Sequence, residues 1–372
     1  MAGRSLALSK PSPYLPPELV ALILRSCRPR EQAVLCRTTK GFQAVVQRPL
    51  YETIQLGSPR QAESFSQTIL KTSKNFAALV KDLRIVIIST FKTKYDSTSF
   101  VALLNLLLLR LQDLQSLRIF IELDDKSYLH RTLSNCTFPK LHTFQFGQTG
   151  EHNAIGVLKF LKRHPSLKHL TLDTDEYTHA IADHSEISGD ALALGELHSY
   201  SGPLNFLKFF AKNASSLSSV FVKLKIRAGI DPPTIPADQI AALENIREMG
   251  RGVSLAFETS VYLSRILQWT TAALPKLQSF AFYCKNGEGL KLRSGPGVSQ
   301  DAVELNTSLF ARFKILRKFI YHDSLVLKAT KSPLNAAEDA KALGKICSTL
   351  TEIAVDGCYF VRKDVEGWVL RE

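Results

Sequence analysis

The chain has 372 residues, of which 45% are hydrophobic and 22% charged, and its formal net charge is +13. This composition is typical of a folded globular protein and excludes an intrinsically disordered one. The most apolar run, Phe100 to Leu109, is about half the ~20 residues that a membrane-spanning helix requires, and Met1 to Lys10 lack the apolar core of a signal peptide. Since the six cysteines are scattered without a CxxC pair, the sequence predicts a cytoplasmic or nuclear protein without disulfides or structural zinc.

The positive charge is distributed unevenly along the chain. Residues 1–60 hold nine Lys/Arg against three Asp/Glu, an excess of six, whereas residues 141–230 hold nine against eight. Nearly half of the net charge therefore belongs to the first sixth of the sequence. This excess indicates either an acidic partner for the N-terminal region or a generally basic, soluble surface.

The first motif in chain order is LPPELVALILRSC, which runs from Leu15 to Cys27. Prolines suit the first turn of a helix, and the apolar residues that follow recur at helical spacing. The pattern predicts a second helix from about Pro29 to Lys40 and a third from about Gly41 to Leu50. So short a module buries little core, and it needs a partner or a neighbouring domain to cover its apolar surface. The residues expected to pack back onto these helices are Tyr51, Ile54 and Leu56.

The run LPPELVALIL, followed by LCRTTKGFQAVVQRPLYETIQL, resembles an F-box, most closely those of filamentous fungi. The sequence departs from the family at Cys27, where an aliphatic residue is usual, and at Tyr51, where tryptophan is common. The alternative is an N-terminal three-helix cap on the rest of the protein. The residues that match the family pattern are Leu15, Pro16, Glu18, Ile23, Leu24, Leu35, Phe42, Pro49, Leu50 and Tyr51.

The resemblance implies that residues 13–56 dock the Skp-type adaptor of a cullin-RING ubiquitin ligase, after a flexible N-terminus of residues 1–12. In this family the adaptor is acidic, so arginines near the helix ends, Arg25, Arg28, Arg30 and Arg37, would steer it electrostatically. The residues expected to form the apolar docking surface are Leu15, Pro16, Leu19, Ile23, Leu24, Leu35, Phe42 and Leu50.

From residue 57 onward, a phrase of the form Leu-x-x-apolar-x-apolar recurs, often after a helical apolar run. This alternation predicts an α/β fold: an irregular leucine-rich-repeat-like solenoid over residues 57–372, with parallel strands on the concave face and helices outside. A compact α/β domain with the same alternation is the alternative. The copies are Ser116–Leu123, Lys140–Phe146, Ser166–Leu172, Ser216–Val222, Lys276–Phe282, Ile315–Tyr321 and Thr349–Val355, with weaker ones at Lys81–Ile87 and Glu196–Ser201.

In each copy the leucine and the apolar positions are expected to point into the core, so the residues between them would face a target protein. Four polar or Gly/Pro-rich segments are predicted as loops: Asp173–Asp190, Ile226–Pro236, Lys285–Val298 and Leu325–Ala337. The predicted target-binding residues are Arg118, Phe120, Thr143, Gln145, His169, Thr171, Ser219, Phe221, Ser279, Ala281, Lys318, Ile320 and Glu352.

No motif indicates catalysis. Asp173–Asp190 is rich in acids and histidines but fits neither an EF-hand nor HExxH, and Lys285–Gly297 lacks the Walker spacing. We find no GxSxG elbow, Cys–His signature or paired carboxylates, and no recognisable nucleic-acid module. The sequence therefore predicts a substrate receptor with an adaptor and a target as partners, and no metal, cofactor, membrane or nucleic acid. The alternatives are a protein-interaction scaffold unrelated to ubiquitin transfer, or an enzyme in a compact α/β fold.

Overall fold

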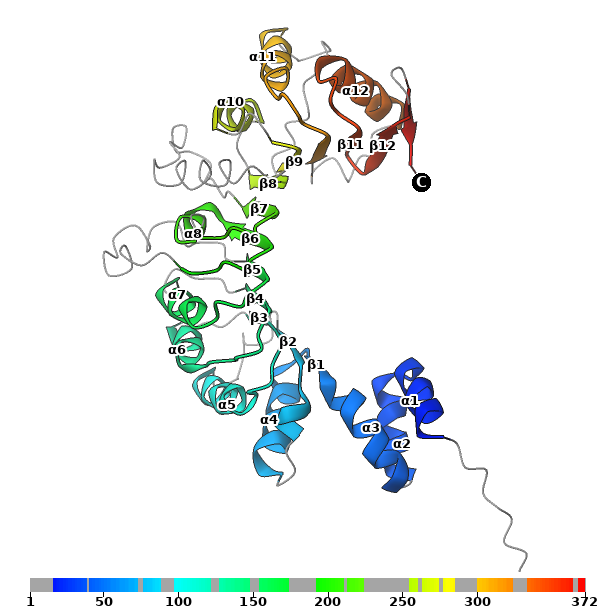
Figure 1. Cartoon of the computed structure of the whole chain (residues 1–372), viewed down its shortest axis with the longest axis vertical. Helices are drawn as coiled ribbons and strands as arrows, with labels where there is room; N and C mark the ends of the chain where they lie inside the picture. The colour runs from blue at the N-terminus through cyan, green and yellow to red at the C-terminus, as the bar shows by residue number, and fades with distance from the viewer. Residues whose placement is uncertain are drawn as a thin grey trace, which may run out of the picture.

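The computed structural model describes residues 16–38, 40–72, 76–87, 97–121, 127–147, 154–173, 192–210, 213–223, 254–259, 263–273, 277–284, 300–323, 333–363 and 367–371. Over these ranges the protein is α/β and is built on one 13-stranded sheet. Figure 1 shows an arc in which the strands follow one another along the inner side and most helices lie on the outer side.

Three helices precede the sheet, where the apolar spacing predicts them: α1 (Pro17–Ser26), α2 (Pro29–Thr38) and α3 (Lys40–Glu52). The side chain of Gln32 reaches from α2 to the end of α1, and its Nε2 donates to the carbonyls of Leu24 at 2.7 Å and Cys27 at 3.1 Å. Because the last carbonyls of a helix lack partners within it, these two bonds fix the corner between α1 and α2.

The chain passes from α3 directly into β1 (Thr53–Leu56), which pairs in parallel with β2 (Asp82–Ile87). We expected Tyr51, Ile54 and Leu56 to pack back onto the three helices. Instead Leu56 belongs to the core of the sheet and Ile54 packs against it, because the pairing of β1 carries both away from the helices. Tyr51 stacks on Phe76 of the short helix η1 (Phe76–Leu79), with ring centroids 4.6 Å apart.

The strands of the sheet lie in chain order. Every neighbouring pair from β1 to β11 is parallel, whereas β11, β12 and β13 are joined by antiparallel pairing. The strands after β2 are β3 (Ser116–Ile121), β4 (Thr143–Gly147), β5 (His169–Asp173), β6 (Ser199–Pro203), β7 (Ser219–Lys223), β8 (Ser254–Thr259), β9 (Ser279–Cys284), β10 (Lys318–Asp323), β11 (Glu352–Val355), β12 (Cys358–Arg362) and β13 (Trp368–Leu370).

Helices alternate with the strands and pack on their neighbours, since α4 contacts α5, α5 contacts α6, α6 contacts α7, and α10, α11 and α12 are in contact in turn. The N-terminus of α4 is capped: Ser58 Oγ accepts from the Gln61 N–H at 3.3 Å, and the Gln61 side chain accepts from the Gly57 N–H at 2.8 Å. These helices are α4 (Pro59–Lys71), α5 (Ser97–Arg110), α6 (Ser127–Asn135), α7 (Ala154–Lys162), α8 (Leu204–Leu207), α10 (Leu263–Ala273), α11 (Gln300–Phe310) and α12 (Pro333–Ile346).

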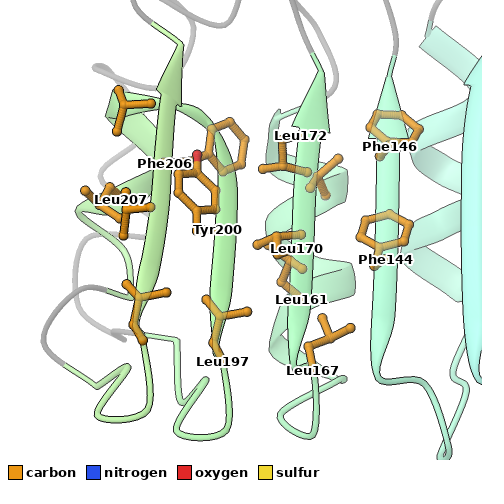
Figure 2. Packing of buried hydrophobic residues seen from close by; sticks show 14 of the residues in the cluster. Phe144, Phe146, Leu161, Leu167, Leu170, Leu172, Leu197, Tyr200, Phe206 and Leu207 are labelled. Atoms are coloured by element: carbon orange, nitrogen blue, oxygen red, sulfur yellow. The ribbon is translucent and has the colours of Figure 1, made fainter. Parts of the chain in front are cut away.

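The core fills the space between the sheet and the outer helices. One buried row crosses the strands in register, and its members are Leu117, Phe144, Leu170, Tyr200, Val220, Leu255, Phe280, Phe319 and Ile353. Figure 2 shows part of this row beside Leu161 of α7 and Phe206 of α8. Rings meet across the layers, as where Phe144 lies 4.5 Å from Phe160 between ring centroids.

Three features of the fold differ from what the sequence pattern predicts. The loop predicted at Leu325–Ala337 is wrong at its end, because α12 begins at Pro333, a proline in a helical first turn. Strand β8 and the hairpin of β12 and β13 were not predicted. The other predicted loops lie outside the described residues, apart from Asp173 at the end of β5.

No helix in the described ranges combines the length and the apolar character needed to cross a bilayer.

Candidate functional site

The inner face of the sheet carries the side chains that alternate with the buried rows. A first row on this face, nearest the start of each strand, runs in register through Asp82, Ser116, Thr143, His169, Ser199, Ser219, Ser279, Lys318 and Glu352. A second row runs through Arg84, Arg118, Gln145, Thr171, Ser201, Phe221, Ala281, Ile320 and Ala354. Most of these side chains are exposed or half-buried, so the face forms a continuous polar and apolar surface.

The predicted target-binding residues fall on these rows. Thr143, His169, Ser219, Ser279, Lys318 and Glu352 belong to the first row, and Arg118, Gln145, Thr171, Phe221 and Ile320 to the second. Ala281 is the exception at the surface, because it is only 7% exposed. Its short side chain is covered by longer neighbours on the inner face, such as Ile320, its register partner on β10. Which of these residues touch a target stays a prediction.

The copy Ser116–Leu123 has a different register in the sheet from the one that the repeated phrase predicts. The phrase predicts that Leu117 corresponds to the first leucine of each later copy, such as Leu141. In the structure Ser116 pairs with Thr143, so Leu114 takes the place of Leu141 and Leu117 that of Phe144. Phe120 consequently lies in a third row beside Gly147. A Cβ on Gly147 would approach Phe120 Cδ1 to 2.3 Å, which shows that the ring rests on the β4 backbone.

Two polar atoms near the start of the inner face lack partners. Ser116 Oγ and Arg118 Nε are buried, and neither has a hydrogen-bond partner among the described residues. Arg118 also lies 3.9 Å from the Asp82 carboxylate across the strand pair. Buried polar atoms are normally hydrogen-bonded, so these two are exceptions among the described residues of the inner face.

The C-terminal end of the inner face is closed by a polar network. Lys318 Nζ lies 2.9 Å from Glu352 Oε2 and donates to the Tyr359 hydroxyl at 3.4 Å, while that hydroxyl donates to Glu352. The hydrogen bonds from Tyr359 and then Lys318 lower the pKa of Glu352, and the bond to Glu352 raises the pKa of Lys318. Lys318 and Glu352 therefore neutralise each other and offer a target little net charge.

The three N-terminal helices form a second candidate surface. Their own core consists of Val20, Leu24 and Val46, with Leu35 and Leu50 packed against it. Side chains on the opposite side of α1 are open, with Leu19 49%, Leu22 60% and Ile23 51% exposed, and Val34 of α2 is 61% exposed.

The predicted adaptor-binding residues divide between this surface and the small core. Leu19 and Ile23 are exposed, as is Pro16, whereas Leu24 is only 1% exposed and therefore supports the helices from inside. Leu15 and the side chain of Phe42 lie outside the described residues. Arg28, Arg30 and Arg37 are exposed beside the surface, and the side chain of Arg25 is not described.

Sequence reasoning missed Leu22 and Val34 on this surface, although helical spacing alone separates Leu22 from buried Leu24. It also missed Arg84 and Ser199 on the inner face, because their copies of the repeat are weak.

Neither segment considered for chemistry forms a described site. The acidic segment beyond Asp173 and the loop Lys285–Gly297 lie outside the described residues. Within the ranges that are described, no group of three or more His, Cys, Asp or Glu side chains is arranged to hold a metal ion. No protein-family model matches the sequence, and a comparison with curated proteins yields no significant match.

Proposed function

We propose that this chain is a non-catalytic substrate receptor of a Skp–cullin–F-box ubiquitin ligase. The helices α1 to α3 act as an F-box that docks the adaptor, and the sheet array, interpreted as a leucine-rich-repeat-like solenoid, holds the target on its inner face. The observation that carries the proposal is the exposed apolar side of α1, formed by Leu19, Leu22 and Ile23.

The three-helix unit supports docking because it is incomplete by itself. Among the side chains that the structure describes in these helices, the buried core consists of Val20, Leu24 and Val46 and is small. Large aliphatic side chains half open to water carry a cost that a partner surface would remove. Arg28, Arg30 and Arg37 are exposed on the same three-helix unit and, with Glu18 and Glu31 also exposed, leave it with an excess of positive charge for the rim of an interface. An apolar centre with a charged rim is the usual anatomy of a protein interface, and the rim sign suits an acidic adaptor.

The sheet array supports target binding through its topology. Strands that follow one another in chain order and pair in parallel place one residue per strand at each level of the inner face. Repeat proteins use such extended faces to hold partners. The receptor would then act by proximity, since it brings the target close to a ubiquitin-charged enzyme and performs no bond chemistry itself.

The test is co-purification of the full chain with a Skp-type adaptor. We expect the wild type to recover the adaptor and a Leu22→Glu/Ile23→Glu variant to lose it, because two carboxylates would be buried in an apolar interface. The matched control is Leu106→Glu on α5, where a leucine is 52% exposed on the outer side of the array. All three proteins must unfold at the same temperature, since the changed positions are exposed.

The receptor role is supported if the wild type and the Leu106→Glu control recover the adaptor and the Leu22→Glu/Ile23→Glu variant does not. If folded wild-type protein recovers no adaptor, or if the α1 variant recovers it as well as the wild type, the F-box assignment fails. A protein-interaction scaffold built on the same array would then be the better account.

A further inference from the structure

A row of polar residues lies one position before the strands, at the edge of the sheet where each strand begins. Backbone hydrogen bonds of 2.8 to 3.0 Å join its members in turn. We call it the edge row, and from β2 to β7 it consists of Lys81, Gln115, His142, Lys168, His198 and Ser218. None of these six is acidic, so the start of the sheet presents donors and cations to a partner.

Three imidazoles gather at the middle of the edge row. His142 and His198 belong to the row, and His169 of β5 lies between them, with its ring centroid 6.5 Å from that of His198. His169 and His198 are exposed and His142 is half-buried. Together with Lys168 they form a group that we call the histidine ledge.

Hydrogen bonds fix the orientation of all three rings. His198 Nδ1 lies 2.6 Å from the Glu196 carbonyl, His169 Nδ1 2.8 Å from Ser199 Oγ, and His142 Nδ1 3.0 Å from Thr143 Oγ1. A carbonyl only accepts, so His198 carries its proton on Nδ1 when neutral. The Nε2 atoms have no partner among the described residues, and they are therefore the positions that face a ligand.

His169, at the centre of the histidine ledge, has cationic neighbours. Burial first, and then the charges of His198, His142 and Lys168, lower the pKa of His169. Glu196 contributes its backbone carbonyl, and Asp113 is held by Lys140 at 2.6 Å and by Lys81 at 3.6 Å. Asp82 lies beside Arg118. The carboxylates of Asp113 and Asp82 are thus held by cations, whereas Glu196 is exposed two residues before His198 and its carboxylate offsets part of the positive charge that the ledge gains on protonation.

We propose that the histidine ledge binds an acidic segment of the target, with carboxylates accepting hydrogen bonds from the Nε2 atoms, and that this binding tightens as the pH falls. An anion stabilises the protonated form of an imidazole that it contacts, so binding takes up protons and strengthens as the pH falls. The inference rests on the proposed function, in which the inner face holds the target.

The surroundings favour a peptide over a nucleic acid as the occupant. Hydroxyl groups of Thr143, Ser199 and Ser219 stand beside the ledge in the first row and can donate to carboxylates. Single-stranded nucleic acids are bound through bases stacked on aromatic side chains. The edge row from β2 to β7 offers histidines but no Phe, Tyr or Trp among its described members.

The test uses the full chain and a fluorescein-labelled peptide of alternating Glu and Ala, with a Gln/Ala peptide of the same length as the uncharged probe. Fluorescence anisotropy should show the acidic peptide binding about fivefold tighter at about pH 6 than at about pH 7.5. The variant His142→Gln/His169→Gln/His198→Gln should lose this dependence. His322→Gln, on the same face at β10, is the matched control and should keep it.

Several results would overturn the inference: equal binding of the two peptides, a pH dependence that survives in the triple variant, or a single-stranded RNA that binds the ledge more tightly than the acidic peptide. Lys168→Gln provides a second readout and should weaken acidic-peptide binding at both pH values. Adaptor co-purification distinguishes the two proposals. If the wild-type chain recovers the adaptor but does not bind the acidic peptide, the histidine ledge proposal fails alone. If it binds the acidic peptide but recovers no adaptor, the receptor role fails alone.

Discussion

The three-helix unit and the sheet array differ in how much of their apolar surface is buried. The array has one continuous cluster that extends from Leu56 to Phe360, and each strand from β2 to β12 is paired on both sides. In the part of α1 to α3 whose side chains are described, Val20, Leu24 and Val46 are buried, whereas Leu19, Leu22 and Ile23 on α1 are exposed. The comparison teaches that stability resides in the array, while the unit keeps apolar surface available for a partner.

The largest effect should come from breaking the array at its centre. Phe144 is fully buried and packs on Phe146 and Phe160. Phe144→Ala should lower the free energy of unfolding by about 3–5 kcal/mol, through lost burial and the cavity that remains. Chemical denaturation measures this change. The companion Leu24→Ala should increase hydrogen exchange in α1 to α3 and leave the array protected. Equal exchange in both regions would contradict the separation of the two cores.

The second largest effect should come from lowering the pH, which we expect to destabilise the sheet array through His164 but not the three-helix unit. Its Nδ1 lies 2.6 Å from the Phe160 carbonyl and its Nε2 accepts from the Phe138 N–H at 2.9 Å, so only the neutral ring satisfies both. Burial lowers the pKa of His164 to about 4. The unfolded chain takes the proton first, so stability present above about pH 6.5 is lost as the pH falls towards 4, up to about 3 kcal/mol.

Urea unfolding followed at several pH values tests this effect. A His164→Asn variant should be less stable than the wild type at neutral pH and should lack this part of the acid dependence. Residues 17–52 contain no histidine, so the hydrogen-exchange protection factors of α1 to α3, which are corrected for the intrinsic pH dependence of exchange, should change little over the same window. A wild type whose stability is constant between pH 6.5 and 4 would show that His164 is not held neutral.

The smallest of these effects should appear at the far end of the array. A Cβ on Gly344 of α12 would lie 2.4 Å from Trp368 Nε1 of β13, so Gly344→Ala must displace the indole. We expect a loss of about 1–3 kcal/mol, confined to the last strands, and a red shift in tryptophan fluorescence. Gly195→Ala is the control, because the nearest atom to its added methyl is 3.9 Å away. Unchanged fluorescence in Gly344→Ala would show that the indole does not pack there.

The repeated phrase predicted most strands of the array because each needs a buried leucine before two polar positions. Strand β8 was not predicted because the sequence has Gly252 two residues before Ser254, whereas it has Leu217 two residues before Ser219, the register partner of Ser254. The hairpin of β12 and β13 escaped because it does not follow the phrase. The antiparallel turn back from β11 into β12 does have a sequence signal, the dipeptide Asp356-Gly357, whose positive φ angles of 47° and 88° form that turn. The three N-terminal helices followed from apolar spacing alone.

Period-2 alternation predicts the inner-face residues, including His169 of the histidine ledge. It does not predict the other members of the ledge. His142, Lys168 and His198 stand one residue before the strands, where alternation assigns no side. They could have been found by aligning the copies, because each follows a buried leucine: Leu141, Leu167 and Leu197. Burial on α1 was also beyond the pattern, since Ile23 and Leu24 are adjacent and only packing against Val46 decides that Leu24 is inside.

The parallel ladder from β1 to β11 imposes a length scale on whatever crosses it. Neighbouring strands are spaced by about 4.8 Å, whereas an extended peptide advances about 3.3 Å per residue. Three peptide residues therefore match two strand intervals, about 9.9 Å against about 9.6 Å. An extended target segment laid across the sheet therefore returns to the same phase with the strands at every third residue. Because successive side chains of an extended chain point to opposite faces, only every sixth residue is both in phase and turned towards the sheet, so side chains recognised by one row would recur with a period of six.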